Sequence, residues 1–443
     1  MATTFLTRAN STPTSSKIFT ISTWLKRSET GNAYTAFVSF WQDASNRISF
    51  GFVNNELEIY GQNGGSQNAF LETSRLFRDT SAWYHIVIAV DTTQSTASNR
   101  VKIYVNGVQQ TAFENSTYPT QNLDIAGLNS NSNIASWNNT GSEYFNGSMT
   151  HVNFIDGTAY PASTFGEVDS TSGIWTAKTT PSVTYGNNGF FLKMENASAM
   201  GTDSSGESNT FTVSGSLTKN QDTPNNNFAT MNPLDNYYQN QTFTQGNNTV
   251  KSDNPSPVKS TLGVSSGKWY IEAKALSVVG SGSDYQIGII SSQVVGTQEL
   301  GHYSNDWSYY GASGSYRNND SFTSYGNSYT AGDIIGVAID LDNNKLYFSK
   351  NGTFQNSGDP TSGSTGTGAI SITTPSSTEL GAYFLGVGGN ANANKYNWNA
   401  NFGNGYFGTT PVSSAGTNAS GNGIFEYDVP TGYTALSTEG LNS

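Results

Sequence analysis

The side chains best suited to bind a ligand lie in an aromatic loop in the second half of the chain. Sugars present apolar C–H faces and many hydroxyl groups, which proteins contact with aromatic rings and with Asn, Asp and Arg side chains. This combination occurs in residues 301–317, in the side chains of His302, Tyr303, Asp306, Trp307, Tyr309, Tyr310 and Arg317. Trp137 and Asn138 repeat it more weakly in the first half. Both places are predicted to bind a ligand; the alternative is that their aromatic rings pack the loop itself or a neighbouring subunit.

Paired carboxylates that could hydrolyse a glycosidic bond are not evident in the sequence. Retaining glycosidases need two carboxyl groups about 5–5.5 Å apart, and alternate residues of one strand can supply them because they share a face. The usual motif on such a strand is Glu-x-Asp-x-Glu or Glu-x-Asp-x-x-Glu. Glu167 and Asp169 match its first two carboxylates, but the third is missing. Glu56 and Glu58 are predicted to face solvent from a short strand. No catalytic residue is predicted, and the protein is not expected to be an enzyme.

Histidine and acidic residues show neither a catalytic triad nor a metal signature. His85 and His151 lie within strand patterns, which favours structural roles, and no spacing gives the loop residue His302 a Ser or Asp partner. The chain has no cysteine, and its candidate calcium ligands are scattered, at Asp91, Asp124, Asp156 and Asp169. No metal or other cofactor is predicted, although loop carbonyls can hold calcium without a sequence signature.

The amino-acid composition argues against two classes of binding partner, nucleic acids and membranes. Charged residues make up only 12% of the 443 residues, the formal net charge is −12, and there are 47 Gly, 24 Tyr and 24 Phe. An acidic, Lys-poor surface repels phosphate groups, so neither nucleic acid nor an anionic membrane surface is an expected partner. No apolar run approaches the 18 or so residues that span a bilayer, and the first residues lack the apolar segment of a signal peptide. Membrane insertion and secretion by such a peptide are therefore not expected.

A strand–turn–strand phrase that occurs twice determines the expected fold. Residues 83–91 and 332–340 are apolar runs, and each is followed by an alternating strand that ends in Asn-Gly, at Asn106-Gly107 and Asn351-Gly352. Asn-Gly between two strands is the strongest short hairpin signal, since both residues tolerate positive φ. Helical periodicity is nearly absent. The sequence therefore predicts an all-β chain with two antiparallel β-sandwiches in tandem.

Clusters of Pro, Gly, Asn and Asp set the expected domain boundaries. The first sandwich is predicted over 1–215 and includes a long Asn/Ser loop at 128–142; the second is predicted over 242–411. Residues 216–241 are expected to form an ordered, turn-rich linker. The tail 412–443 is apolar enough to dock on the second domain.

Both halves resemble known families. The second half resembles the SPRY family in five segments that follow in the family's order, residues 267–272, 287–289, 329–342, 346–352 and 401–403. The first half looks like a laminin-G or pentraxin-type module of the concanavalin-like superfamily in residues 19–26, 83–87, 101–107 and 145–152. These resemblances imply two tandem antiparallel jelly rolls of the concanavalin-like type. The composite is similar to bacteriophage virion proteins in residues 154–157, 165–169, 185–190, 222–233 and 430–436.

The virion resemblance implies a structural protein on the surface of a phage particle, made in the host cytoplasm. A tail-fibre, spike or capsid-decoration subunit would contact other virion proteins and attach to a host-surface glycan or protein, and it could form a homo-oligomer. Two alternatives remain open: a purely architectural decoration protein without a ligand, and a polysaccharide depolymerase. A bacterial lectin or adhesin is disfavoured by the lack of a signal peptide. The fold by itself does not decide among them.

Overall fold

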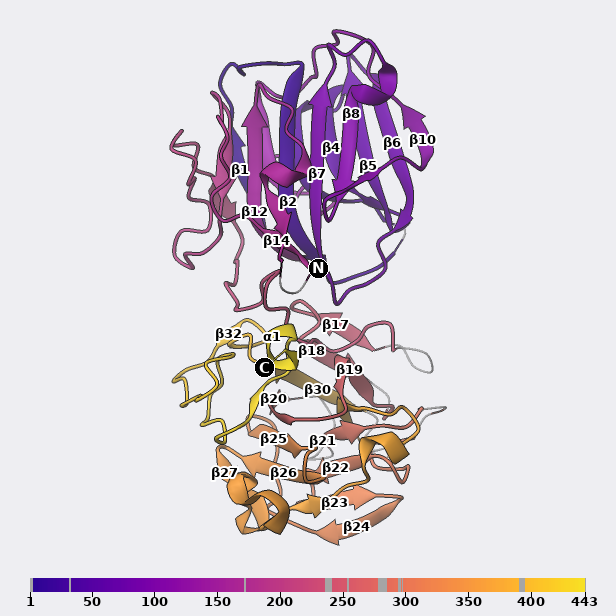
Figure 1. Cartoon of the computed structure of the whole chain (residues 1–443), viewed down its shortest axis with the longest axis vertical. Coiled ribbons are helices and arrows are strands. Elements are labelled where there is room, and N and C mark those ends of the chain that lie inside the picture. Colours follow the sequence, from indigo (N-terminus) through magenta and orange to yellow (C-terminus); the bar gives the residue numbers. More distant parts are fainter. Residues whose placement is uncertain are drawn as a thin grey trace. The chain divides into compact units, whose positions relative to one another are not determined.

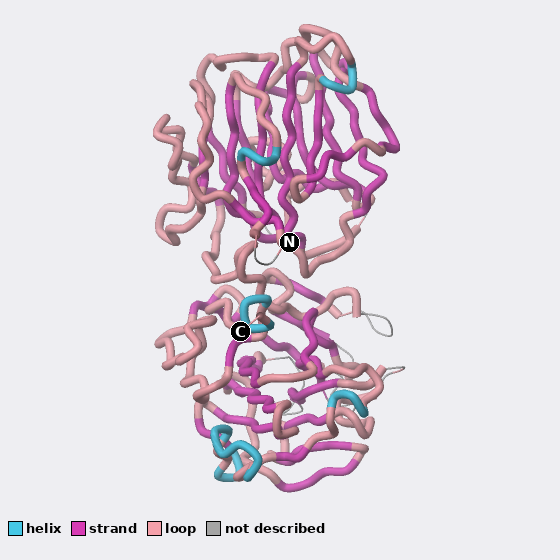
Figure 2. The backbone as a smooth tube through the Cα atoms, in the orientation of Figure 1, coloured by secondary structure: helices cyan, strands magenta, loops and turns pink. Residues whose placement is uncertain are grey.

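The chain forms two compact units, which are described separately. The computed structural model describes residues 3–31, 33–170, 173–235, 241–252, 255–277, 285–293, 296, 298–389 and 395–442. The units are Met1–Lys219 and Asn220–Ser443 (Figure 1). Strands dominate both of them, and the helical segments are short (Figure 2). These segments are η1 (Ala97–Asn99), η2 (Ala162–Thr164), η3 (Gln355–Ser357), η4 (Pro360–Thr365), η5 (Pro375–Ser377) and α1 (Thr438–Leu441).

The first unit consists of two antiparallel sheets and a small hairpin. Within the described residues, the larger sheet has eight strands, in the order β10 (Phe113–Thr117), β6 (Ser66–Leu76), β5 (Glu56–Asn63), β4 (Asn46–Val53), β3 (Thr35–Asp43), β11 (Asn131–Ile134), β1 (Phe5–Ala9) and β16 (Thr212–Ser214). The other has six, in the order β15 (Phe190–Leu192), β12 (Gly147–Asp156), β2 (Ile18–Arg27), β7 (Trp83–Asp91), β8 (Val101–Val105) and β9 (Val108–Gln110). The hairpin is β13 (Gly166–Val168) and β14 (Trp175–Ala177).

The two sheets of the first unit pack face to face around an aromatic core. Phe19 of β2 lies against Phe40 of β3 and Phe50 of β4, with ring centroids 6.3 and 6.4 Å apart. Alternation along each strand turns one set of side chains into this core and the other set outward. On β4, Phe50 is buried in the core, and its neighbours Ser49 and Gly51 face the other side of the sheet. The outer face of this sheet therefore carries a separate set of residues.

Strand β11 lies inside the stretch predicted to be a loop, so that part of the prediction was wrong. Residues 131–134 pair with β1 on one side and with β3 on the other, in the middle of the larger sheet. Ser132 and Asn133 are buried, and their side chains are hydrogen-bonded to Asn10 and Ser39 at 2.9 and 3.1 Å. A buried strand made of Asn and Ser has no apolar periodicity, which is why the sequence pattern does not show it.

The second unit is built in the same way. In its described part, one sheet has nine strands, in the order β17 (Thr242–Thr244), β18 (Thr249–Ser252), β30 (Tyr396–Asn401), β20 (Lys268–Ala275), β25 (Ile334–Asp340), β26 (Lys345–Lys350) and β27 (Thr353–Phe354), with β28 (Ile370–Ser371) on β26 and β33 (Thr434–Ala435) on β20. The other has six, in the order β19 (Val258–Val264), β29 (Tyr383–Gly389), β21 (Tyr285–Ile290), β22 (Trp307–Tyr310), β23 (Ser315–Asn318) and β24 (Ser321–Ser324). A separate hairpin joins β31 (Tyr406–Phe407) and β32 (Thr410–Pro411).

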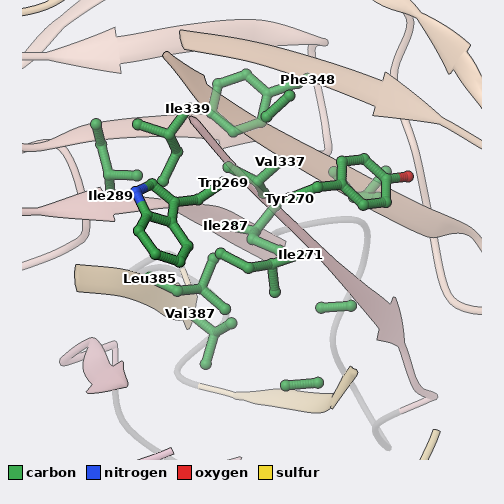
Figure 3. Packing of buried hydrophobic residues seen from close by; sticks show 14 of the residues in the cluster. Trp269, Tyr270, Ile271, Ile287, Ile289, Val337, Ile339, Phe348, Leu385 and Val387 are labelled. Carbon is green, nitrogen blue, oxygen red and sulfur yellow. The ribbon is translucent and has the colours of Figure 1, made fainter. Parts of the chain in front are cut away.

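Both sheets of the second unit contribute to one core. Trp269 and Ile271 of β20 and Val337 of β25 meet Ile287 of β21 and Leu385 of β29 in the interior (Figure 3). Nearly all of these side chains are fully buried. Together with the first unit, this packing confirms the predicted all-β class with antiparallel sandwiches.

Both copies of the doubled phrase form the predicted turn. Asn106 and Gly107 have φ values of 48° and 82°, and Asn351 and Gly352 have 47° and 81°. In each unit the Asn side chain also accepts a backbone N–H from the first strand of the phrase. Asn106 accepts that of His85 in β7 at 2.8 Å, and Asn351 accepts that of Ile334 in β25 at 2.9 Å. The two units therefore share this turn down to its side-chain hydrogen bond.

The C-terminal segment is held against the second unit by a buried carboxylate. Glu272 of β20 is fully buried and accepts the backbone N–H groups of Glu426 and Tyr427 at 2.8 and 2.9 Å. The Tyr270 hydroxyl donates to the same carboxylate at 3.0 Å. Burial raises the pKa of Glu272 to about 7, against the opposing effect of these hydrogen bonds. Residues 220–235 of the predicted linker belong to this unit, as does the tail.

Candidate ligand-binding face

The outer face of the larger sheet in the first unit gathers aromatic and charged side chains in rows across its strands. In one row Trp41 of β3 pairs with Arg47 of β4, and Arg47 pairs with Gln62 of β5. In the next row Tyr60 of β5 pairs with Phe70 of β6. Cross-strand neighbours lie about 4.5–5.5 Å apart at Cβ, so each row is a set of contacting side chains.

Arg47 lies inside a cluster of aromatic rings. Its guanidinium carbon is 5.5 Å from the ring centre of Trp41, 5.4 Å from that of Tyr60 and 4.8 Å from that of Trp137. The Trp41 and Trp137 rings meet edge to face, with centroids 4.9 Å apart. Tyr60 in turn packs against Phe70 at 6.1 Å. We call Trp41, Arg47, Tyr60, Phe70 and Trp137 the Arg47 face.

The loop after β11 brings Trp137 to this face. Ser39 Oγ donates to the carbonyl of Ser136 at 3.0 Å, which ties the loop to the outer side of β3. Asn138 Nδ2 donates to Ser142 Oγ at 2.9 Å, and its Oδ1 accepts the backbone N–H of Thr140 at 3.1 Å. The Asn138 amide is therefore engaged within the loop. Trp137 is only half-buried and keeps part of its ring exposed.

Arg47 carries a charge that the described residues leave without an ion pair. The residue is 9% exposed, and its Nε and Nη1 have no hydrogen-bond partner. Burial lowers the pKa of Arg47 below its usual value, and Tyr60, Tyr34 and Asp43 oppose that shift. An arginine stays protonated at physiological pH, so the cation is held mainly by the faces of aromatic rings.

Two carboxylates face each other on the same side of the sheet. Glu58 of β5 pairs directly with Glu72 of β6, and Asn115 of β10 pairs with Glu72 and donates its side-chain N–H to it. Glu58 lies on the outer face of the sheet, as predicted, but it is half-buried there, and Glu72 is buried. Burial, together with the Glu72 carboxylate, raises the pKa of Glu58 to about 7. Glu72 lies 14 residues from Glu58, so no single-strand motif reveals the pair.

The aromatic loop of the second unit divides between core and surface. Trp307 packs against Tyr383 with ring centroids 5.8 Å apart, and Tyr309 is fully buried against Phe348 at 5.3 Å. Asp306 is buried as well: it accepts the backbone N–H groups of Ser291 and Ser292, and burial raises its pKa to about 6. Trp307, Tyr309 and Asp306 therefore pack inside the domain, which is the alternative to ligand binding. Residues that keep exposed surface are His302, Tyr303 and Tyr310.

Arg317 in this loop is neutralised by carboxylates. It forms ion pairs with Glu299 and with Asp320, the second at 2.5 Å, and Asp320 also contacts His302 Nδ1 at 2.8 Å. Its guanidinium lies 5.3 Å from the ring centre of Phe322, which is 49% exposed. The loop thus offers an exposed aromatic edge with its charges already paired.

His85 of β7 is a buried histidine held by its neighbours. His85 is fully buried, stacks on Trp24 at 4.7 Å, accepts the indole N–H of Trp175 at 2.8 Å and is hydrogen-bonded to Ser22 at 2.9 Å. Burial lowers the pKa of His85 to about 3, which keeps it neutral.

The described part of the chain shows neither a metal-binding cluster nor a membrane-spanning helix. It contains no group of three or more His, Cys, Asp or Glu side chains that could hold a metal ion. None of its helices is long and apolar enough to cross a membrane.

Comparison with family models finds two matches. Residues 3–163 match a model described as the concanavalin A-like lectin/glucanases superfamily, of the third laminin-G type, and residues 268–369 match the SPRY domain. No curated protein matches the chain.

Solved structures with similar folds include a SPRY domain and a pentraxin. The SPRY domain of human HERC1 is 16% identical, with a TM-score of 0.29, and the match covers 38% of this chain and 96% of that one. The heptameric SAP-like pentraxin from Limulus polyphemus is 16% identical, with a TM-score of 0.29, and the match covers 40% of this chain and 86% of that one.

Proposed function

Because the chain joins an N-terminal concanavalin-like domain to a C-terminal SPRY domain, both of them binding-type folds, we propose that it is a recognition protein without catalytic activity. Its first domain binds a glycan through the Arg47 face. The SPRY domain supplies a second surface for a protein or a glycan, at the exposed edge around His302, Tyr303 and Tyr310.

The single observation that carries this proposal is the aromatic cluster on the outer side of the sheet. Aromatic residues usually serve the core, yet Trp41, Tyr60, Phe70 and Trp137 are only half-buried and lie on the opposite side of the sheet from it. Exposed rings of this kind stack on the C–H faces of sugars. Gln62, whose side chain donates to the Tyr60 hydroxyl at 3.0 Å, adds a polar group at the same place.

We propose the surface of a bacteriophage particle as the setting, as a tail-fibre, spike or decoration subunit that attaches to the host. Support comes from the sequence resemblance to virion proteins. Many copies on one particle would turn modest single-site affinity into firm attachment through effective concentration. Antibody labelling of intact particles tests this setting, and absence of the protein from particles would overturn it.

Binding of the protein to host cells and to a glycan array tests the recognition function. We expect Trp137→Ala to lower binding about tenfold, because stacking on one aromatic ring contributes roughly 1–3 kcal/mol by analogy with other stacked ligands. Phe322→Ala is the matched control, an exposed aromatic residue of the other domain. Equal loss in both variants would place binding outside the Arg47 face, and no binding by the multimerised wild type would favour the architectural alternative.

A second candidate function, glycoside hydrolysis, is favoured by one observation, the facing carboxylates of Glu58 and Glu72. Directly opposed residues on neighbouring strands have Cβ atoms about 4.5–5.5 Å apart, so their carboxyl groups can approach the separation of about 5–5.5 Å that retaining glycosidases use. A carboxyl group with a pKa near 7 is suited to act as a general acid. Release of reducing ends from host polysaccharide, lost in Glu58→Gln, would establish this activity; no release would leave the protein a binder.

A further inference from the structure

A cavity of about 560 Å³ lies in the second unit, between the turn that joins β19 to β20 and the C-terminal tail. Its volume is within the range of small-molecule sites, about 300–1,000 Å³. It opens to solvent, because its walls include the exposed residues Ser265 and Ser266 of the turn and Ala419, Ser420 and Leu441 of the tail. The SPRY match covers residues 268–369, so these walls lie outside the part of the chain that matches that family.

Trp269 of β20 supplies an aromatic wall of the cavity. Its indole N–H donates to the carbonyl of Ser266 at 2.7 Å, which fixes the ring against the turn. Two glycines of the lining adjoin the ring: a Cβ at Gly267 would lie 3.4 Å from Nε1, and one at Gly440 would lie 3.0 Å from Cζ3. Larger residues at these positions would occupy the space beside the indole, so the glycines keep its edge open to the cavity.

Charged groups of both signs lie beside this ring. Lys268, whose side chain is 25% exposed, pairs with the buried carboxylate of Asp340 at 3.2 Å. Asp340 also accepts the backbone and side-chain N–H groups of Asn343 at 3.0 and 2.8 Å. Asp342 is exposed and accepts the backbone N–H of Gly267 through Oδ1 at 2.9 Å. The Lys268 ammonium and the Asp342 carboxylate therefore keep capacity for further hydrogen bonds.

This combination selects a neutral ligand. Asp342 would repel an anion at this place, and Lys268 would repel a cation. A hydroxyl group suits both, because it can accept from the ammonium and donate to the carboxylate. A ligand with several hydroxyls and an apolar C–H face would also make use of the Trp269 ring, which is the way that proteins contact sugars.

An extended peptide fits the cavity less well. Peptides often bind by adding a strand to a free sheet edge. Beside the cavity the edge of β20 is already occupied, since Trp269 and Tyr270 pair with Thr434 and Ala435 of β33. Main-chain recognition along β20 is therefore closed there, whereas side-chain contacts with hydroxyls remain open.

We propose that this cavity binds a neutral sugar unit of a glycan, whose hydroxyls bond to Lys268 and Asp342 while its C–H face packs on Trp269. The cavity shares no residue with the Arg47 face or with the exposed edge around His302. It is thus an additional site, and it gives the second unit a ligand class of its own.

The test compares variants of the full-length protein on an array of neutral and carboxylate-bearing glycans. Ala419→Trp fills the cavity from the tail, and Ser265→Trp fills it from the turn. Ala312→Trp is the matched control, because Ala312 is an exposed alanine of the same unit outside the cavity. Thermal unfolding of each variant verifies that it is folded.

We expect the wild type to bind a set of neutral glycans that Ala419→Trp and Ser265→Trp bind at least about tenfold more weakly, since burying a sugar and an indole in one space is impossible. Ala312→Trp should bind them as the wild type does. The cavity-dependent signal should persist in Trp137→Ala, which lacks a ring of the Arg47 face. Asp342→Asn should gain binding of carboxylate-bearing glycans, because it removes the repulsion of anions.

The outcomes separate this inference from the proposed function. Glycan binding that neither Trp variant of the cavity alters overturns the cavity site and leaves the Arg47 face standing. Loss in the cavity variants, with none in Trp137→Ala, supports the cavity and overturns the Arg47 face. A loss confined to carboxylate-bearing glycans, or a peptide-array signal that Ala419→Trp removes, overturns the assignment to a neutral sugar. Absence of binding to every glycan overturns both proposals.

Discussion

Arg47 in the first domain and Arg317 in the second are equally buried and yet in opposite electrostatic states. Each is 9% exposed, and each lies against at least one aromatic ring. Arg317 is paired with Glu299 and Asp320, whereas Arg47 lies against ring faces and forms no ion pair within the described residues. A buried arginine is therefore informative about function only when its partners are known. Arg317 is held by carboxylates of its own domain, and Arg47 is held mainly by aromatic rings.

The largest expected effect is on the stability of the SPRY domain. Arg317→Met should lower its free energy of unfolding by about 3 kcal/mol, because the change leaves the nearly buried Glu299 carboxylate without its cation. Denaturant unfolding measures this. The double variant Arg317→Met/Glu299→Gln should recover part of the loss. A change below about 1 kcal/mol in the single variant would show that the ion pair is not a stabilising contact.

Arg47→Met should change stability far less than Arg317→Met. Losing the cation–π contacts costs about 0.5–2 kcal/mol, and removing an unpaired buried charge offsets that cost. The expected net change in the free energy of unfolding is within about 1 kcal/mol. Equal destabilisation by the two Met variants would break the contrast between the arginines.

The facing carboxylates predict that the stability of the first domain falls as the pH rises. Glu58 has a folded pKa of about 7, above its usual value of 4.5, so between these pH values the folded state binds more protons than the unfolded state. The contribution of protonated Glu58 to the free energy of unfolding is complete below about pH 4.5 and is lost by about pH 7. In Glu58→Gln the free energy of unfolding should depend less on pH in this window. Glu272→Gln, in the other domain, should leave the transition of the first domain unchanged.

The smallest expected effect concerns the exposed end of the Arg317 cluster. His302 and Asp320 are partly exposed, with side-chain accessibilities of 28% and 53%, and exposed pairs contribute at most about 1 kcal/mol. His302→Gln should lower the free energy of unfolding by less than that, with no difference from the wild type in high salt. A larger, salt-independent loss would assign His302 a packing role.

Local patterns predicted the framework well. The Asn-Gly turns at 106–107 and 351–352 have the expected positive φ values, because those residues tolerate them whatever surrounds them. Strand β11 was missed for the opposite reason. Its Asn and Ser residues are buried through hydrogen bonds with distant parts of the chain, which leave no periodic pattern.

The Arg47 face was predicted only in part. Trp137 and Asn138 were singled out from their types, and the structure places Trp137 on the face and uses the Asn138 amide to hold the loop. Trp41, Arg47 and Tyr60 were not identified as site residues. Each of them looks ordinary in its own strand and becomes notable only beside the others.

The sequence by itself determined most of the segments that become strands, the Asn-Gly turns, and the assembly into two sandwiches, because alternation and turn propensity act over a few residues. Only the tertiary structure decided which side chains meet on a face. The register that opposes Glu58 to Glu72, and the loop that brings Trp137 over Arg47, depend on pairing between distant strands. A shift of one residue in either strand would turn these groups to the other side of the sheet. Whether Arg47 or Arg317 was left unpaired was settled in the same way, by neighbours that strand pairing supplied.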